Sequence, residues 1–354
     1  MLKLIDLYIA RTLLGTVVAT LSVLIGLSAL IKFVEQLRRV GQGDYDMTLA
    51  ALYVILSLPR EIELFLPMAT LLGGLIGMGL LAQSSELVVM QASGMSRTKI
   101  TISAMKSMVI VIIAVMALGE WVTPQSESKA KQIRTQALSG GSLISSKSLT
   151  WAKDGNDFVS IGEVIDQNTL QNVNIYKFDD NLNLTRIINA AQAKYIRPDW
   201  ELNDVEQVNL GDRRINNIKL NMLSWNSSIT PDKLGVVAIK PEALSIRGLA
   251  DYVNYLDNNG QETSRYELAL WRKILQPVSV AVMLLLALSF IFGPLRSVTM
   301  GARTGMGILA GIGFFVSNEM FGQAALVFQL SPALGAVLPS VMFAGIAVLL
   351  LKRQ

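Results

Sequence analysis

The sequence contains no histidine and no cysteine, and these two absences exclude several kinds of chemistry. A His–Cys metal site, a Ser-His-Asp triad, a cysteine nucleophile and a thiol redox pair all need one or both residues. The phosphate-binding pattern G-x-x-x-x-G-K-[ST] is also missing, because the glycines at 73, 74, 77 and 79 lie in an apolar run without the lysine. The composition argues against an enzyme, and any ATP that drives this protein must be bound by another chain.

Charge is scarce as well. Only 16% of the 354 residues are charged, against about 25% in a typical soluble domain. Residues 121–267 carry 34 of the 58 charged side chains, so the rest of the chain is apolar over long stretches. The sequence therefore predicts an integral membrane protein with one large polar insert.

About 20 apolar residues are needed to cross the hydrocarbon core of a bilayer. The apolar runs predict six transmembrane helices, at Thr12–Ile31, Leu64–Ala82, Ile100–Gly119, Ile274–Leu295, Thr304–Phe321 and Pro332–Leu351. The first run is too long for a signal-peptide core, and we expect it to be retained. A single helix over 48–82 would be about 52 Å long at 1.5 Å per residue. Its first part is therefore expected above the bilayer, with a bend near Pro59 and Pro67.

The topology follows from the basic residues next to short loops, which mark the cytoplasmic side. Six alternating spans place these residues on one side: Lys3, Arg11, Arg97, Lys99, Arg296, Arg303, Lys352 and Arg353. We expect a multi-pass membrane protein with both termini in the cytoplasm. The insert between spans three and four then lies outside, since long domains cross regardless of charge.

The insert changes from helical to β periodicity between residues 145 and 226. Ile218, Leu220 and Met222 alternate with polar residues, as in a half-buried strand. Further strands are expected at 173–178, 186–196 and 200–210, with turns at 154–156, 179–181, 197–199 and 211–212. Closely spaced strands without long helices favour an antiparallel sandwich or a jelly roll, and the pattern leaves both open. After Pro241, Ser245 is expected to cap an amphipathic helix that leads back to the membrane.

Basic residues gather on the outer side, where the usual bias would keep them few. They follow span one, follow span three and precede span four: Lys32, Arg38 and Arg39; Lys129, Lys131 and Arg134; Arg265, Arg272 and Lys273. As a set they favour a binding site for an anionic lipid headgroup. The structural alternative is local pairing, of Glu35 with Lys32 or Arg39 and of Glu127 with Lys131.

A short cytoplasmic helix is expected between spans two and three, from Glu86 to Gly94. Ser85 is placed to cap it, Glu86 suits its positive end, and Gly94 is placed to end it. A helix lying along the membrane between two spans is typical of a subunit that docks to a cytoplasmic motor. Ordinary capping chemistry explains the same residues equally well. Glu319 and the cluster of Arg60, Glu61 and Glu63 are interpreted as interfacial pairs.

Seven strings of the sequence carry a family resemblance: SELVVMQASG (85–94), IKFVEQL (31–37), GQGDYD (41–46), GEWVTPQ (119–125), WAKDGN (151–156), TPDKLGVVA (230–238) and ALSFIFGPLRSV (287–298). They resemble the LptF/LptG family, the permease subunits of the bacterial lipopolysaccharide exporter, and are similar to those of its LptG branch. The resemblance covers essentially the whole chain, in order. It implies six spans in the bacterial inner membrane and a periplasmic antiparallel β-jellyroll domain.

The same resemblance implies the partners and the roles of residues. The partners would be an LptF-like permease subunit, two LptB-like ATPase subunits and an LptC-like single-span protein, with no nucleic acid. The chain itself would hold no cofactor, since ATP and Mg²⁺ bind the ATPase. Lipopolysaccharide phosphates and core sugars would contact five residues that we call the basic cluster: Lys32, Arg38, Arg39, Lys131 and Arg134. Glu86 would couple the chain to the ATPase. Some of these family positions interchange lysine and arginine, which keeps the charge but not the bidentate geometry.

The implied division is residues 1–125 for spans one to three with the short helix at 85–94, 126–262 for the β-jellyroll domain with its connecting helix, and 263–354 for spans four to six. Two other classes of protein fit the sequence less well. A secondary transporter would need broken helices and ionisable residues at the bilayer midplane, but spans one, two and four are uncharged there. A membrane anchor for the β domain would need neither the short helix nor the outer basic residues.

Overall fold

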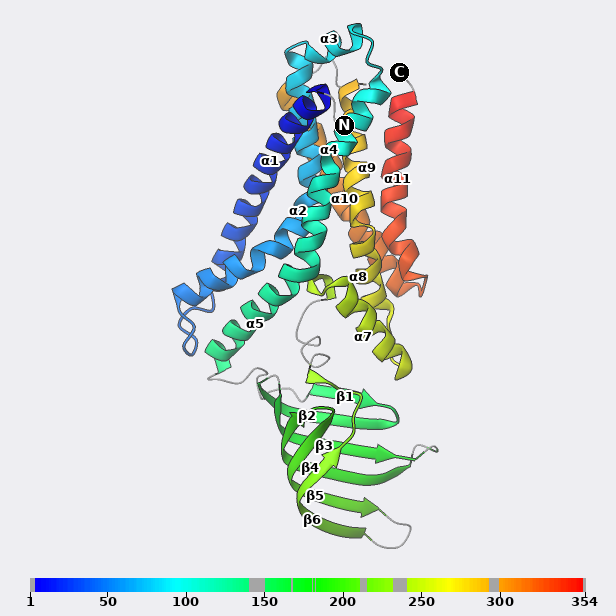
Figure 1. Cartoon of the computed structure of the whole chain (residues 1–354). Coiled ribbons are helices and arrows are strands. Elements are labelled where there is room, and N and C mark those ends of the chain that lie inside the picture. The colour runs from blue at the N-terminus through cyan, green and yellow to red at the C-terminus, as the bar shows by residue number, and fades with distance from the viewer. Residues whose placement is uncertain are drawn as a thin grey trace.

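The computed structural model describes residues 4–139, 150–166, 168–179, 181, 183–210, 215–231, 241–292 and 299–352. Long helices form one part of the molecule and a β-sheet forms the other, with both termini at the end away from the sheet (Figure 1). The helices are α1 Leu4–Leu37, α2 Met47–Gln83, α3 Glu86–Ala92, α4 Arg97–Ala117, α5 Thr123–Ser139, α7 Ile246–Asn258, α8 Ser264–Ile274, α9 Gln276–Phe292, α10 Met300–Val327 and α11 Pro332–Lys352. A π-helix, η1 (Leu118–Val122), joins α4 to α5, and a 3₁₀ turn, η2 (Pro241–Ala243), precedes α7.

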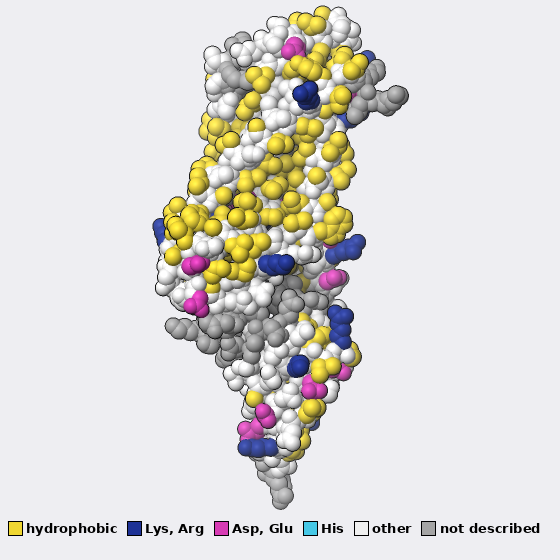
Figure 2. Space-filling model, turned by 60° about the vertical axis from the view of Figure 1, so that its left-hand side comes forward, with side chains coloured by type: hydrophobic (Ala, Val, Ile, Leu, Met, Phe, Trp, Pro, Cys, Tyr) yellow, Lys and Arg dark blue, Asp and Glu magenta, His cyan; other side chains and the backbone are white. Residues whose placement is uncertain are grey.

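Four helices in the described part of the chain are long and apolar enough to cross a membrane: α1, α2, the continuous helix Arg97–Leu138 and α11. A fifth span results if α8 and α9, which meet at an angle of 52°, are counted together. The 28-residue α10 is not among these candidates, and it carries the polar pair Asn318 and Glu319. The prediction of a membrane protein is confirmed, but the prediction of six spans is not. Hydrophobic side chains cover the helical part in Figure 2, and charged side chains gather below this band.

The helix α2 runs through the middle of the bundle, between α1, α5, α9 and α10. It stays one helix of 37 residues although Pro59 and Pro67 lie inside it, and its first part runs obliquely before it turns along the bundle (Figure 1). Helix α1 approaches closely at Gly73, where an added Cβ would lie 2.5 Å from the Val17 Cα. Thr16 Oγ1 donates a hydrogen bond to the Gly73 carbonyl oxygen at 2.7 Å. Small residues allow this contact, as in other membrane helices.

The β domain is a six-stranded antiparallel sheet, which confirms the predicted class of domain. Its strands are β1 Thr150–Asp154, β2 Asp157–Asp166, β3 Thr169–Phe178, β4 Leu184–Ile196, β5 Asp199–Leu210 and β6 Ile215–Trp225. They lie in the sheet in chain order. Neighbouring strands in the sheet are also neighbours in the chain, so the described strands form one meander, without the two sheets and crossing connections of a jelly roll. The predicted turn at 211–212 lies outside the described residues.

One face of the sheet packs against α7. The core contains Val159, Leu170, Trp200 and Leu202 from the strands, all almost fully buried. Tyr252, Tyr255 and Leu256 of α7 complete it. Ser245 caps α7 as predicted, with its Oγ accepting a hydrogen bond from the Gly248 N–H at 2.9 Å. The amphipathic α7 thus covers the β core on its way to α8.

Candidate functional site

The basic cluster occupies the end of the helical bundle that faces the sheet, on α1, on the turn after it and on α5. The chain between α1 and α2 docks onto α5 there, because the Asp44 N–H donates to the Ala137 carbonyl oxygen at 2.9 Å. Gly43 has a φ of +56°, and an added Cβ would lie 2.5 Å from the same oxygen. Tyr45 is almost fully buried beside Ala137. These contacts bring the predicted residues of 32–39 and 131–134 to the same end of the molecule.

Lys32 is engaged by a buried carboxylate from α2. Its Nζ lies 2.6 Å from the Glu61 Oε1, and the Glu61 side chain is only 6% exposed while that of Lys32 is 24% exposed. Ser28 Oγ donates a second hydrogen bond to Glu61. Among the described residues Glu35 forms no ion pair, so the expected pairing of Lys32 with Glu35 is wrong. Arg38 and Arg39 are exposed in the turn after α1.

Arg134 approaches α2 from the other side. Its guanidinium lies over the Tyr53 ring, with 4.8 Å between the Cζ and the ring centroid, and its Nη1 donates to the Tyr53 hydroxyl oxygen at 3.1 Å. Lys131 is half-buried one turn earlier on α5. Glu127, expected to pair with Lys131, lies 3.9 Å from Arg60. The basic cluster therefore lies on both sides of α2. Lys32 and Arg134 contact side chains of α2, whereas Arg38 and Arg39 are exposed to solvent.

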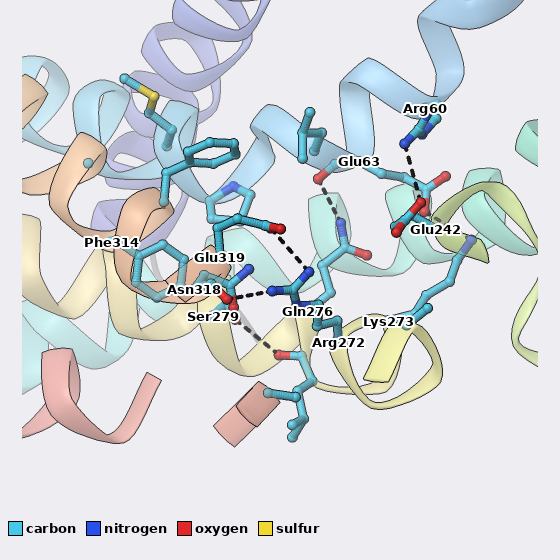
Figure 3. Close-up of a pocket in the computed structure, with 18 of the residues that line it drawn as sticks. Arg60, Glu63, Glu242, Arg272, Lys273, Gln276, Ser279, Phe314, Asn318 and Glu319 are labelled. Carbon is cyan, nitrogen blue, oxygen red and sulfur yellow. Dashed lines mark hydrogen bonds and ion pairs between the residues drawn. The ribbon is translucent and has the colours of Figure 1, made fainter. Parts of the chain in front are cut away.

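A second group of charges lines a cavity of about 470 Å³ between α2, η2, α8, α9 and α10, which we call the polar cleft. Figure 3 shows its side chains converging from these elements. The ionisable residues that line it are Arg60, Glu63, Glu242, Arg265, Arg272, Lys273 and Glu319. Apolar residues line the rest: Leu64, Pro67, Met68, Phe314 and Phe315 among them. The polar cleft is amphiphilic, with charge and aromatic surface in one space.

Ion pairs cross the polar cleft from one helix to another. Arg60 lies 3.6 Å from Glu242. Arg272 lies 3.3 Å from Glu319 and also donates to the Asn318 carbonyl oxygen, although its buried Nε has no partner in the described part of the chain. Each pair has one carboxylate that is about half exposed, and pairs of this kind add little stability. The sequence signalled Arg272 and Lys273 only as part of the outer basic residues and gave no sign that α10 would face them.

The helix α3 lies at the end of the bundle opposite the sheet (Figure 1). It begins at Glu86 and ends at Ala92, two residues before the predicted end. Gly94 terminates it as predicted, with a φ of +91°. The expected cap is wrong, because Ser85 makes no capping hydrogen bond with its side chain; instead the Ser84 Oγ donates to Glu86 Oε1 at 2.9 Å.

The faces of α3 divide its contacts. Leu87 and Met90 pack into the core of the helical bundle, whereas Val88 and Val89 are 49% and 66% exposed. Glu86 is partly exposed beside Tyr8 of α1. This arrangement leaves a carboxylate and two apolar side chains available to another protein.

The family model described as "Lipopolysaccharide export system permease LptF/LptG" matches residues 7–353. The chain belongs to the LptF/LptG family. It is 48% identical to the lipopolysaccharide export system permease protein LptG of Escherichia coli (strain K12), over 99% of this chain and 98% of that protein. It is also 48% identical to LptG of Haemophilus influenzae, over 100% of this chain and 99% of that protein.

The other branch of the LptF/LptG family is more distant. The permease protein LptF of Escherichia coli (strain K12) is 26% identical to this chain over 44% of the chain and 46% of its own length. The similarity to the sequence strings of LptG is thus confirmed across the whole chain. In this LptF/LptG family member, the basic cluster and α3 lie at opposite ends of one apolar bundle (Figure 1).

Proposed function

We propose that this chain is a permease subunit of a lipopolysaccharide exporter. Paired with an LptF-like subunit, it takes lipopolysaccharide from the outer leaflet of the bacterial inner membrane and passes it to a periplasmic bridge. Two LptB-like subunits bind ATP and Mg²⁺ and hydrolyse the ATP, and an LptC-like single-span protein completes the complex. Membership of the LptF/LptG family over the whole chain carries this proposal. The termini lie in the cytoplasm and the β domain in the periplasm.

The basic cluster supplies the headgroup site. Lipid A carries phosphates, and exposed guanidiniums bind phosphate through two parallel hydrogen bonds. Arg38 and Arg39 are exposed and make the first contact. Lys32 is a quarter exposed, so it reaches a phosphate only by sharing its ammonium with Glu61. The apolar surface of the helices then accepts the acyl chains.

The helix α3 connects the chain to the ATPase. Glu86 and the exposed Val88 and Val89 dock on an LptB-like subunit, with the carboxylate facing a basic residue there. Closure of the ATPase dimer moves α3, and α3 moves the bundle because Leu87 is buried in the main core of the helices. The cavity that holds the lipid collapses, and the lipid leaves toward the periplasm.

Purification of the tagged chain in mild detergent, with mass spectrometry of the proteins and lipids bound to it, tests the assembly. We expect an ATPase, a second permease subunit and lipid A species. The purified complex in proteoliposomes should then release labelled lipopolysaccharide to a soluble acceptor when ATP is added. A chain that carries only ordinary phospholipid and no ATPase would contradict the proposal and would favour a membrane anchor.

Two variants separate binding from coupling. Arg38→Gln/Arg39→Gln should weaken lipid A binding about tenfold or more, since each charged hydrogen bond contributes about 1.5–3 kcal/mol. Lys99→Gln, which removes an exposed cation from α4 at the opposite end of the bundle, is the control and should bind normally. Glu86→Ala should abolish release while lipid A still binds, whereas Ser93→Ala at the other end of α3 should not. Loss of lipid binding in Glu86→Ala with normal ATPase docking would refute the assigned roles.

A further inference from the structure

A buried lysine joins four parts of the chain beside the polar cleft. The Lys273 side chain at the end of α8 is only 8% exposed, and a lysine has three N–H donors. Its Nζ lies 3.2 Å from the Glu63 Oε2 of α2, and it donates to the Gly119 carbonyl oxygen at 3.0 Å and to the Leu244 carbonyl oxygen at 2.7 Å. All three donors are therefore used, and two of the acceptors are backbone groups.

The Gly119 carbonyl is available because the helix changes register there. In η1 the Thr123 N–H donates to the Leu118 carbonyl oxygen, which is the i→i+5 pattern of a π-helix. The corresponding partner of Gly119 is residue 124, a proline without an N–H. Lys273 supplies the missing donor. A Cβ at Gly119 would lie 2.5 Å from the Glu63 Oε2, so the glycine also leaves room for the carboxylate.

The next residue of η1 holds the start of α7. The Glu120 carboxylate accepts hydrogen bonds from the Ile246 N–H at 2.8 Å and from the Arg247 N–H at 3.4 Å. The third N–H of this first turn goes to Ser245, so the side chains of Glu120 and Ser245 satisfy all three. A carboxylate at this end also suits the helix dipole. The segment 244–247 is thus tied to η1 in two ways. Lys273 bridges the carbonyl oxygens of Gly119 and Leu244, and Glu120 accepts hydrogen bonds from the first turn of α7.

The far part of α7 is fixed to the sheet. The Tyr255 hydroxyl donates to the Lys153 carbonyl oxygen at 2.9 Å, and Lys153 Nζ donates to the Asn259 carbonyl oxygen at 2.9 Å. The Asn259 side chain accepts from the Gly155 N–H in the β1–β2 turn at 2.8 Å. One helix therefore contacts the membrane bundle at its first turn and the β domain at its last.

We propose that Glu63, Gly119, Glu120, Leu244 and Lys273 form a joint that positions α7, so that movement of α2 and η1 in the membrane is passed to the β domain. The inference rests on the proposed function, in which the β domain receives lipid as the bundle closes. Regular α-helical geometry is interrupted at three points close to these residues. η1 is a π-helix, η2 is a 3₁₀ turn, and α8 and α9 meet at an angle of 52°. The five residues, called here the polar joint, lie where relative motion of the two parts would be concentrated.

Replacing Lys273 and Glu63 together by neutral residues tests whether this pair positions α7 or only compensates two buried charges. Lys273→Met alone leaves Glu63 buried without its cation and risks misfolding. Lys273→Met/Glu63→Gln leaves no uncompensated charge, and the amide oxygen can still accept from Thr123, but the bonds to Gly119 and Leu244 are gone. Lys273→Arg is the conservative variant, and Arg247→Gln, which removes an exposed side chain from α7, is the control.

The assay uses the full complex in nanodiscs with cysteine-free partners. The chain has no cysteine of its own, so spin labels at Asn254→Cys in α7 and Gln125→Cys in α5, both exposed, report the position of α7 by double electron–electron resonance. We expect one narrow distance in the native complex, which is kept when the ATPase is trapped with vanadate because α7 moves together with η1. In Lys273→Met/Glu63→Gln we expect a broadened distribution that changes on trapping.

The same double variant should assemble normally and keep its ATPase rate, but release about tenfold less lipopolysaccharide per ATP, as for two sites that have lost their coupling. Lys273→Arg should recover part of that loss, and Arg247→Gln should behave as native. A double variant with the native distance distribution and native release would overturn the proposal. A native complex that releases no lipopolysaccharide would instead refute the proposed function. The spin-label distances would still show whether the polar joint positions α7.

Discussion

Replacing Glu61 by glutamine should strengthen the binding of an anionic lipid. In the free chain the Glu61 carboxylate lies 2.6 Å from the Lys32 ammonium and competes with any phosphate that approaches it. Glutamine keeps an oxygen for the Ser28 hydroxyl but removes the charge. Lys32 is 24% exposed, so the freed ammonium stays hydrated and the fold is expected to tolerate the change.

The size of the effect follows from the repulsion that is removed. A phosphate bound to Lys32 would lie about 6 Å from the carboxylate, where two unit charges interact by about 0.7 kcal/mol in water and about 3 kcal/mol at an effective dielectric constant of 20. Salt and the partial exposure of the site bring the expected gain to about 1–2 kcal/mol. That corresponds to a dissociation constant about 5–30 times lower.

Titration of the nucleotide-free complex with fluorescent lipid A in detergent, at two salt concentrations, measures this gain. Glu35→Gln is the matched control, since it removes an exposed carboxylate three residues from Lys32 that takes no part in an ion pair within the described chain. Only Glu61→Gln should bind more tightly, and the gain should shrink at high salt. Equal effects of the two variants, or weaker binding in Glu61→Gln, would refute the competition between Glu61 and the lipid.

Three further predictions concern stability. Gly119→Ala forces a methyl group against the Glu63 carboxylate and should lower the free energy of unfolding by about 1–3 kcal/mol in a detergent melt, while Gly345→Ala, with open space around it, should not. Arg134→Lys loses the planar contact with the α2 tyrosine and should cost about 1 kcal/mol in the same melt; an unchanged midpoint would contradict this. Burial raises the pKa of the Tyr255 hydroxyl to about 12, so its contribution to stability is present below pH 10 and is lost as the pH rises through 12; absorbance at 295 nm should show a late ionisation that Tyr255→Phe removes.

Elements that depend on local pattern were predictable from the sequence. The alternation at 218–222 and the turn at 154–156 give β6 and the β1–β2 turn, because a half-buried strand imposes a period of two and Gly155 supplies the φ of +63°. The capping of α7 by Ser245 and the end of α3 at Gly94 follow from backbone groups that need partners.

Contacts between distant segments could not be predicted in the same way. Glu61 and Lys32 meet because α1 and α2 pack together, and Glu63 and Lys273 are separated by most of the chain. A bend was expected near Pro59 and Pro67, and α2 runs through both prolines as one helix whose first part is oblique to the bundle (Figure 1). The run 126–139 looked like part of the insert by its charge but continues the helix after α4. No local pattern records which helix will face which.

The order of the strands has a consequence for how the β domain forms. Each strand from β2 to β6 pairs with the strand that directly precedes it in the chain. In the proposed topology the insert reaches the periplasm from its N-terminal end, so every strand finds its partner already there as it emerges, and short-range pairings of this kind close quickly. The bonds that join Lys153 and Gly155 to Tyr255 and Asn259 span about a hundred residues. The sheet can therefore assemble during translocation. The last step is the packing of α7, which completes the core just before the fourth span is synthesised.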